Sequence, residues 1–279
     1  MKKLAVHLHL HYDDQWPEIR RYLNNLVRVD HDLFITMTEP HPEIEAEINA
    51  LDENIYIWQV ENNGYDIGPF IYFLHHIDLA QYQYILKLHT KGKRSRNYTW
   101  LNHHRLDNAL WGKILWQSML ATESRLQENL QILDNNPQFG MAGSKYCLTA
   151  SLTDYASLLP QINGELKKLG IPLEKQLSFI AGSMFLARAS VLKPLLHYRL
   201  SDFPKTDAHV KEGTLAHLIE RIFGCLAQNI YPIKHGNYTF DFIFVAFKRF
   251  LYQKKQTKRG TQVVKICKIP VYARKIKEA

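Results

Sequence analysis

Short apolar segments alternate with helix-like segments through the first 88 residues of the chain. Strands are expected at residues 4–10, 32–38, 55–60 and 84–88, and helices at 15–26, 43–51 and 70–77. Repetition of strand, helix and strand predicts a mainly parallel sheet, because parallel neighbours need a long crossover connection that a helix can supply. The pattern therefore predicts a Rossmann-like α/β fold with helices on both faces of a central sheet.

The remainder of the chain is less regular. The pattern predicts helices at residues 100–133, 191–197 and 213–225, and strands at 139–143, 179–187 and 230–233. With 279 residues, 46% of them hydrophobic, the chain has ample material for a large core. We expect one α/β domain over residues 1–238 and a basic amphipathic tail over 239–279.

The expected tail differs from the rest in composition. Aromatic residues recur between Phe240 and Tyr252, and lysines and arginines follow them. An aromatic stripe beside a basic run is typical of a segment that lies on an anionic membrane surface. A helix docked on the body of the protein, with a solvated basic end, explains the same pattern, and the sequence leaves both interpretations open.

The net charge of +8 and the isoelectric point near 9.2 favour anionic partners. Three scattered cysteines form no metal-binding or disulfide pattern, which suits a reducing compartment. A signal peptide is not visible, and no apolar run reaches the ~18 residues that span a bilayer. The expected location is the cytoplasm, either free or peripheral on the cytoplasmic face of the inner membrane.

The sequence of residues 84–94 indicates the centre of a ligand site. A buried strand ends there and is followed directly by His89, Lys91, Lys93 and Arg94. Ligands of open α/β sheets bind beyond the carboxyl ends of the strands. A histidine and several cations in that position predict a seat for a phosphorylated ligand.

A second strand, turn and helix lie at residues 61–70. Glycines at positions 64 and 68 let the backbone approach a ligand closely, and the Asp66 carboxylate can accept bonds from ribose or sugar hydroxyls. An Asx turn before a helix explains the same residues. The residues predicted to bind the ligand in this strand-end region are Tyr12, Thr38, Asn63, Gly64, Asp66, Gly68, His89, Lys91 and Lys93.

Four segments carry a resemblance to a known family. They read ENNGYDIGPF (61–70), LKLHTK (86–91), AGSMFLAR (181–188) and EGTLAHLIER (212–221). Together they resemble the motifs of the rhamnan synthesis protein F family, over residues 4 to about 235 and not over the tail. The resemblance implies an A-type glycosyltransferase fold and transfer of a sugar from a nucleotide-sugar donor to a saccharide or lipid-linked acceptor in cell-surface polysaccharide or lipopolysaccharide synthesis. Rhamnose, from a dTDP donor, is what the family name implies, and an inverting transfer is expected.

One departure from A-type transferases bears on the mechanism. Those enzymes end the central strand in Asp-x-Asp, which holds a divalent metal on the diphosphate, whereas this chain has His89-Thr-Lys91. Mg²⁺ and Mn²⁺ prefer oxygen ligands, and a lysine repels them. We therefore expect cations of this loop to neutralise the leaving group, with His89 as hydrogen-bond donor or acid, and we expect no metal or other cofactor.

The family resemblance also suggests a general base. Glu212 precedes a helix and matches an acidic position of the distant A-type motif, so it is predicted to take the proton of the acceptor hydroxyl. A charge favoured by the helix dipole explains it equally, and Asp207 and Glu220 compete for the role. Predicted contacts to the acceptor or the transferred sugar are Gly182, Ser183, Met184, His217 and Arg221.

Parts of the sequence also suit two other function classes. His7, His9 and His11 alternate along the first strand and so share one face, which is a pattern used by metal-dependent hydrolases. Such enzymes need further ligands at later strand ends, and only His89 and His217 are available. A nucleic-acid-binding protein suits the basic charge, but no helix-turn-helix, zinc finger or RNA-binding signature is present, so nucleic acid is not an expected partner.

Overall fold

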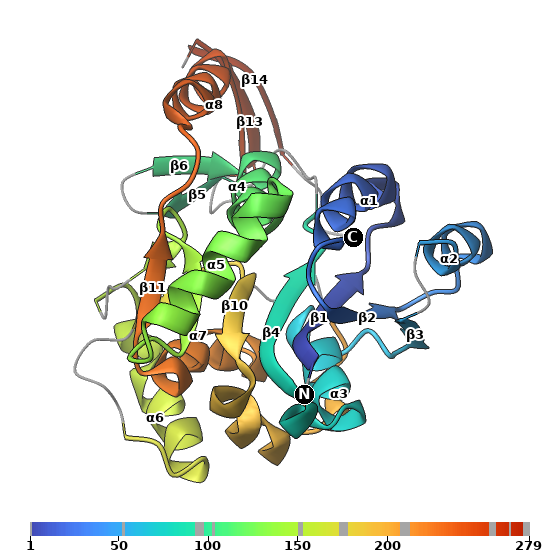
Figure 1. Cartoon of the computed structure of the whole chain (residues 1–279). Coiled ribbons are helices and arrows are strands. Elements are labelled where there is room, and N and C mark those ends of the chain that lie inside the picture. The colour runs from blue at the N-terminus through green and yellow to red at the C-terminus, as the bar shows by residue number, and fades with distance from the viewer. Residues whose placement is uncertain are drawn as a thin grey trace. The chain divides into compact units, whose positions relative to one another are not determined.

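The computed structural model describes residues 2–51, 54–92, 98–101, 104–149, 153–172, 178–206, 213–256, 261–267 and 269–275 (Figure 1). The chain forms two compact units. Unit 1 comprises residues 1–91 and 113–235, and unit 2 comprises 92–112 and 236–279. Residues 92–112, which the sequence pattern assigns to the first domain, group with the C-terminal segment in the structure.

Unit 1 is built on a seven-stranded sheet with the order β11-β7-β10-β4-β1-β2-β3. The strands are β1 (Lys2–Leu10), β2 (His31–Met37), β3 (Ile55–Gln59), β4 (Tyr82–His89), β7 (Met141–Ser144), β10 (Phe185–Arg188) and β11 (Ile230–Ile233). Only β10 runs antiparallel to its two neighbours within this sheet. The predicted α/β class with a mainly parallel sheet is confirmed.

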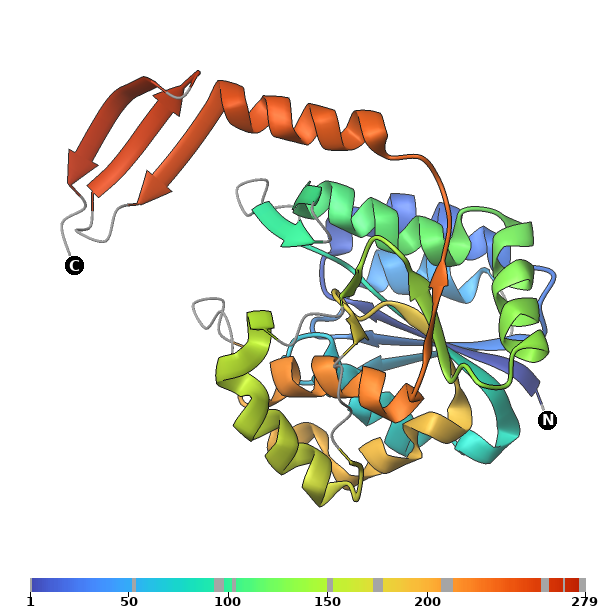
Figure 2. The ribbon, with the colours of Figure 1, turned by 90° about the vertical axis from the view of Figure 1, so that its left-hand side faces the viewer.

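Helices cover both faces of this sheet (Figure 2). The helices of unit 1 are α1 (Trp16–Leu23), α2 (Pro42–Asn49), α3 (Ile67–His76), α5 (Glu123–Asn135), α6 (Leu159–Lys168) and α7 (Leu215–Ala227), together with the C-terminal part of α4 (Asn108–Leu120). One side carries α3, α6 and α7, and the other carries α1, α4 and α5.

The face below α3 has an unusual row of side chains. Pairing in register places Phe34, His7, Lys87 and Phe185 side by side across four strands. The His7 ring stacks on Phe73 with centroids 4.8 Å apart, and Lys87 Nζ lies 5.3 Å from the centre of the Phe70 ring. A lysine and a histidine are therefore enclosed in an aromatic core, next to the edge where β1 and β4 end.

The predicted strand at 179–187 is wrong in one respect, because it is broken in the middle. Phe179–Ile180 forms β9, which pairs with β8 (Leu148–Thr149), and β10 begins only at Phe185. Gly182 and Ser183 between them have φ values of 89° and 49°, which no strand residue adopts. The break turns the chain from one sheet into the other and aims the Ser183 side chain at β4.

The predicted helix at 100–133 also needs correction. Its first residues form the hairpin β5 (Tyr98–Leu101) and β6 (His104–Asp107), and the helical part divides into α4 and α5. A hydrogen bond from the Arg125 backbone N–H to the Thr122 side chain caps α5, so the chain starts a new helix there.

Unit 2 combines this hairpin with the C-terminal residues. Its helix α8 (Thr239–Leu251) leads into an antiparallel sheet of β12 (Tyr252–Gln256), β13 (Thr261–Ile266) and β14 (Ile269–Lys275) (Figure 2). The buried side of α8 packs on β6, where Phe242 stacks on His104 at 4.1 Å. Over the part of the chain that the structure describes, no helix is both long and apolar enough to cross a membrane.

Candidate functional site

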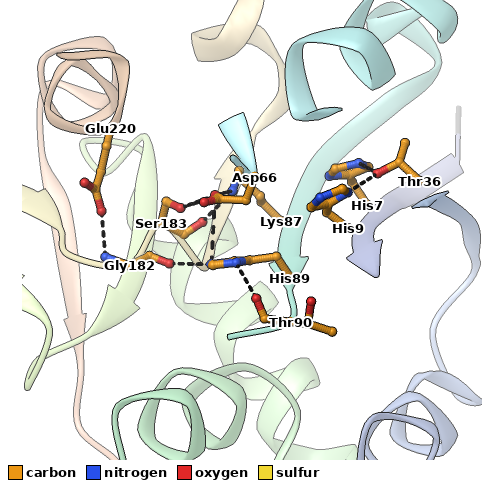
Figure 3. A network of polar contacts seen from close by, with 10 residues as sticks. All are labelled: His7, His9, Thr36, Asp66, Lys87, His89, Thr90, Gly182, Ser183 and Glu220. Carbon is orange, nitrogen blue, oxygen red and sulfur yellow. Dashed lines mark hydrogen bonds and ion pairs between the residues drawn. The ribbon is translucent and has the colours of Figure 1, made fainter. Parts of the chain in front are cut away.

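The antiparallel direction of β10 decides which residues meet. Because β10 starts at the edge where β4 and β1 end, Gly182 and Ser183 lie directly beside Lys87 and His89 (Figure 3). Asp66, at the start of α3, reaches the same point. We call Asp66, Lys87, His89 and Ser183 the strand-end cluster.

The centre of the cluster is the Asp66 carboxylate. The Lys87 ammonium donates to Asp66 Oδ2, and the Ser183 hydroxyl donates to the same oxygen at a distance of 2.5 Å. His89 Nε2 lies 3.9 Å from this oxygen. Lys87 also donates to the Ser183 carbonyl at 3.1 Å. These contacts occupy Oδ2 of an Asp66 side chain that is 18% exposed.

Burial and charge act in opposite directions on this pair. Burial alone raises the pKa of the Asp66 carboxyl, but His89, Lys87 and the bond from Ser183 hold it well below its usual range. Burial lowers the pKa of the Lys87 ammonium, and Asp66 and Glu220 counteract this. The pair is therefore an ionised Lys–Asp contact inside the protein, where each charge depends on the other.

Both ring nitrogens of His89 face backbone carbonyl oxygens, and a neutral imidazole can donate to only one of them. Nε2 lies 2.7 Å from the Gly182 carbonyl oxygen, and Nδ1 lies 3.1 Å from the Thr90 carbonyl oxygen. Burial lowers the pKa of His89 to about 4, although Asp66 opposes this. A neutral imidazole with Nε2–H donating to Gly182 follows, so His89 fixes the turn before β10.

Lys91 lies at the exit of β4 and is partly buried. The Gln15 side chain forms two hydrogen bonds with the Lys91 backbone. Gln15 Nε2 donates to the Lys91 carbonyl at 2.7 Å, and the Lys91 N–H donates to Gln15 Oε1 at 3.2 Å. Burial lowers the pKa of the Lys91 ammonium, and the fields of Asp66 and Glu220 raise it. The Lys91 ammonium is thus within electrostatic reach of Asp66, and its role in donor binding stays a prediction.

Glu220 of α7 reaches the cluster from the opposite side. Its Oε1 accepts a hydrogen bond from the Gly182 N–H at 2.7 Å, and its Oε2 lies 3.6 Å from Arg221 Nη1 (Figure 3). Arg221 is buried over the Phe179 ring and donates to the His217 carbonyl. These contacts make Glu220 and Arg221 supports of the turn at Gly182.

The predicted glycines of the first turn have a packing reason. A side chain at Gly64, which has φ 69°, would meet the Phe203 ring at 2.6 Å, and one at Gly68 would meet the Asn63 carbonyl oxygen at 2.0 Å. The Asn63 side-chain amide donates to the Glu61 carboxylate, and the Asn63 backbone forms an antiparallel β-bridge with Lys205. The backbone at Gly64 and Gly68 thus packs closely against neighbouring residues, and this packing positions Asp66 between them.

The histidines of β1, and His11 just after it, contact threonines at the end of β2. His7 Nε2 and His9 Nδ1 lie 3.0 and 3.1 Å from Thr36 Oγ1, and His11 Nδ1 lies 3.2 Å from the hydroxyl of Thr38. Among the described residues, no group of three or more His, Cys, Asp and Glu side chains is arranged to hold a metal ion. The contacts explain these histidines as parts of the sheet edge, which weakens the hydrolase interpretation.

The remaining predicted residues divide into three groups. His217 contacts the turn before α3, since the centroids of its ring and the Tyr65 ring are 5.3 Å apart. Its Nδ1 lies 2.6 Å from the Thr214 hydroxyl. Met184 is fully buried, which favours core packing over contact with a sugar, and Tyr12 is exposed beside the β1 end. Lys93 and Arg94, and the candidate bases Asp207 and Glu212, lie outside the described residues.

Sequence reasoning missed two members of the site. Lys87 was assigned to the buried strand, although a lysine between Leu86 and Leu88 needs a buried partner and so signals an ion pair. Gln15 carried no signal, because its role depends on the approach of β1 and β4.

Comparison with protein families identifies the chain. The model of the rhamnan synthesis protein F family matches residues 1–231. The chain belongs to the rhamnan synthesis protein F family. This confirms the resemblance of the four motifs, and the matched stretch contains the whole strand-end cluster and ends before α8.

Two curated relatives of this family member come from Xanthomonas campestris pv. campestris. Both are uncharacterized proteins WxcX, from strain B100 and from strain ATCC 33913, and each is 29% identical over 175 residues. The match covers 59% of this chain and 22% of either relative, so the chain spans about a fifth of the proteins it resembles.

Solved structures show a weaker likeness. S. aureus TarS 1–349 has a TM-score of 0.44 at 11% identity, covering 84% of this chain and 58% of TarS. Glucosyl-3-phosphoglycerate synthase from Mycobacterium tuberculosis, in complex with Mn²⁺, UDP and glucosyl-3-phosphoglycerate, has a TM-score of 0.36 at 12% identity, covering 98% and 90% of the two chains. Scores below 0.5 carry no argument about the site.

Proposed function

We propose that this chain is an A-type glycosyltransferase that moves a sugar from a nucleotide-sugar donor to a saccharide or lipid-linked acceptor of a surface polysaccharide. Family membership supports glycosyl transfer, and the family description, rhamnan synthesis, favours rhamnose as the sugar. The observation that supports the proposal is the strand-end cluster, in which the ionised Asp66 carboxylate and the Lys87 ammonium lie at the strand ends where α/β proteins bind ligands.

Asp66 binds the donor in this proposal. Its Oδ2 is occupied by Lys87 and Ser183, so Oδ1 accepts a hydrogen bond from a ribose or sugar hydroxyl. Lys87 keeps the carboxylate ionised and fixes its direction. Such a preset acceptor orients the donor without reorganisation when the glycosidic bond breaks.

Transfer proceeds without a divalent metal in this proposal. The β4 end offers a carboxylate already bound by an ammonium and an imidazole whose two nitrogens face carbonyl oxygens, and this donor set does not suit Mg²⁺ or Mn²⁺. Lys91 instead neutralises charge on the departing nucleoside diphosphate, assisted by Lys93 from the following residues. We propose Glu212 as the base that deprotonates the acceptor hydroxyl in an inverting transfer.

Donor binding is the first test. We expect UDP-, dTDP-, GDP- or CMP-linked sugars to raise the melting temperature of the full chain, with dTDP-rhamnose the first candidate, and the shift to persist in chelator. Lys91→Ala should remove it, whereas Lys167→Ala, an exposed lysine on α6, should not. A shift that requires Mn²⁺ would reject the metal-free mechanism, and no shift with any donor would reject the function.

Two glutamates provide a matched pair for the base. Glu212→Gln should reduce turnover by about 100-fold or more and leave donor binding unchanged, because a general base contributes roughly 10²–10⁴-fold. Glu220→Gln keeps an oxygen that can accept the Gly182 N–H and should retain most of the turnover. The opposite result would move the base to Glu220.

A further inference from the structure

The distribution of charge along the chain is uneven. Residues 236–279 hold 11 of the 35 lysines and arginines but only two of the 27 aspartates and glutamates, so this segment carries +9. The preceding 235 residues together carry −1. The basic character of the protein is therefore confined to the segment that forms most of unit 2.

The same segment exposes large apolar side chains. Phe240, Ile243, Phe244, Phe247 and Leu251 repeat with the i, i+3, i+4 and i+7 pattern of a helix and so share one side of α8. All five are exposed, from 84% for Phe240 to 40% for Leu251, whereas Val245 on the other side of the helix is buried. We call these five residues the α8 stripe.

The turn between β13 and β14 extends this surface. The Cys267 N–H donates to the Leu251 carbonyl at 3.0 Å, which holds the turn against the end of α8. Ile266 and Ile269 flank that turn and are also exposed. In unit 1, the exposed large apolar residues of the described chain are separated in sequence, at Tyr12, Val27, Tyr56 and Leu196.

We propose that unit 2 binds the surface of an anionic lipid bilayer, with the α8 stripe in the interface and the basic residues of the segment against the headgroups. Apolar side chains on one side of a helix and surplus cations nearby are the two features that such binding requires. A second copy of the chain fits less well, because the association would bring two segments of +9 together. This inference stands apart from the proposed transfer reaction.

Binding to vesicles tests the proposal with the full chain. Sedimentation with phosphatidylcholine vesicles, with and without phosphatidylglycerol, should show binding that depends on phosphatidylglycerol and weakens in salt. Phe244→Ser/Phe247→Ser should weaken it at least about 10-fold, since each buried phenylalanine contributes substantially to partition. Val27→Ser, an exposed apolar residue of unit 1, is the matched control and should bind as the unchanged chain does.

A charge variant separates the two contributions. Lys254→Gln/Lys255→Gln should weaken binding to the phosphatidylglycerol vesicles roughly 10-fold and leave the weak binding to phosphatidylcholine unaltered. Failure of the unchanged chain to bind either vesicle would overturn the proposal, as would full binding by the double serine variant. A dimer in solution that Phe244→Ser/Phe247→Ser converts to a monomer would also overturn it and assign the stripe to a second copy.

Discussion

The strand-end cluster and the α8 stripe depart from the usual distribution of side chains in opposite directions. Lys87 is a charged group without exposure to solvent, and Phe240 is a large apolar group that is almost fully exposed. Charged side chains are seldom buried unless paired, and contiguous apolar surface is seldom exposed without a partner.

Burying a charge and exposing apolar surface are both unfavourable, and the two regions differ in what offsets this. In the cluster, the protein itself supplies the partner, because Asp66 and Ser183 satisfy Lys87. For the α8 stripe, the partner that we propose is a bilayer. From this comparison we expect a substitution in the cluster to act on folding and on the proposed ligand binding together, and a substitution in the stripe to act on the proposed association alone.

The largest expected effect comes from breaking the buried pair. Asp66→Asn leaves the Lys87 ammonium buried without an opposite charge and should cost about 3–5 kcal/mol in the free energy of unfolding, measured in urea. Glu123→Gln, which breaks an exposed pair with Arg28, should cost about 0–1 kcal/mol. Equal small costs would mean that the cluster does not depend on its ion pair. Lys87→Met added to Asp66→Asn should recover part of the loss.

A glycine substitution sharpens the comparison within the site. Gly68→Ala places a methyl group 2.0 Å from the Asn63 carbonyl oxygen and should cost about 1–3 kcal/mol in unfolding free energy, and it should weaken donor binding by moving Asp66. Gly164→Ala, in α6 with open space around it, should instead stabilise by about 0.5–1 kcal/mol. A neutral Gly68→Ala would show that this turn can shift freely.

The buried histidines of unit 1 predict a pH dependence. The pKa values of His9, about 3, and His89, about 4, lie below the ordinary 6.5 mainly because both are buried. The unfolded chain binds more protons between pH 6.5 and 4, so stability should fall as the pH falls, by about 1.4 kcal/mol per unit for each histidine.

Urea unfolding across this pH window measures the slope. His9→Gln should flatten it by about one histidine's share, and the exposed His197→Gln serves as the control for the substitution itself. An unchanged slope in His9→Gln would contradict the assignment of His9 as a neutral buried group.

The smallest effect on stability is expected in the stripe. Phe244→Ser/Phe247→Ser should change the unfolding free energy by no more than about 0.5 kcal/mol, because both rings are exposed. Val245→Ser, on the buried side of the same helix, should cost about 1–3 kcal/mol. A large loss in the double variant would place the stripe in the protein core.

Much of unit 1 follows from its sequence pattern. The first four strands and their helices form where apolar periodicity predicts them, and the family motifs contain Asp66, His89 and Ser183, which the structure brings together. The break at Gly182 and Ser183 did not follow, because one small glycine–serine pair inside an apolar run also fits a continuous buried strand. The grouping of 92–112 with the C-terminal segment depends on contacts between residues far apart in the sequence.

By itself, the sequence determined the α/β class, the polar residues at the strand ends and the concentration of cations after residue 235. These follow from local periodicity and composition, which each segment carries independently of its neighbours. Only the tertiary structure decided that Lys87 is the partner of Asp66, that Glu220 holds Gly182, and that the aromatic side of α8 faces outward. Such partners are set by strand order and by the reversed direction of β10, and neither is encoded within any one segment.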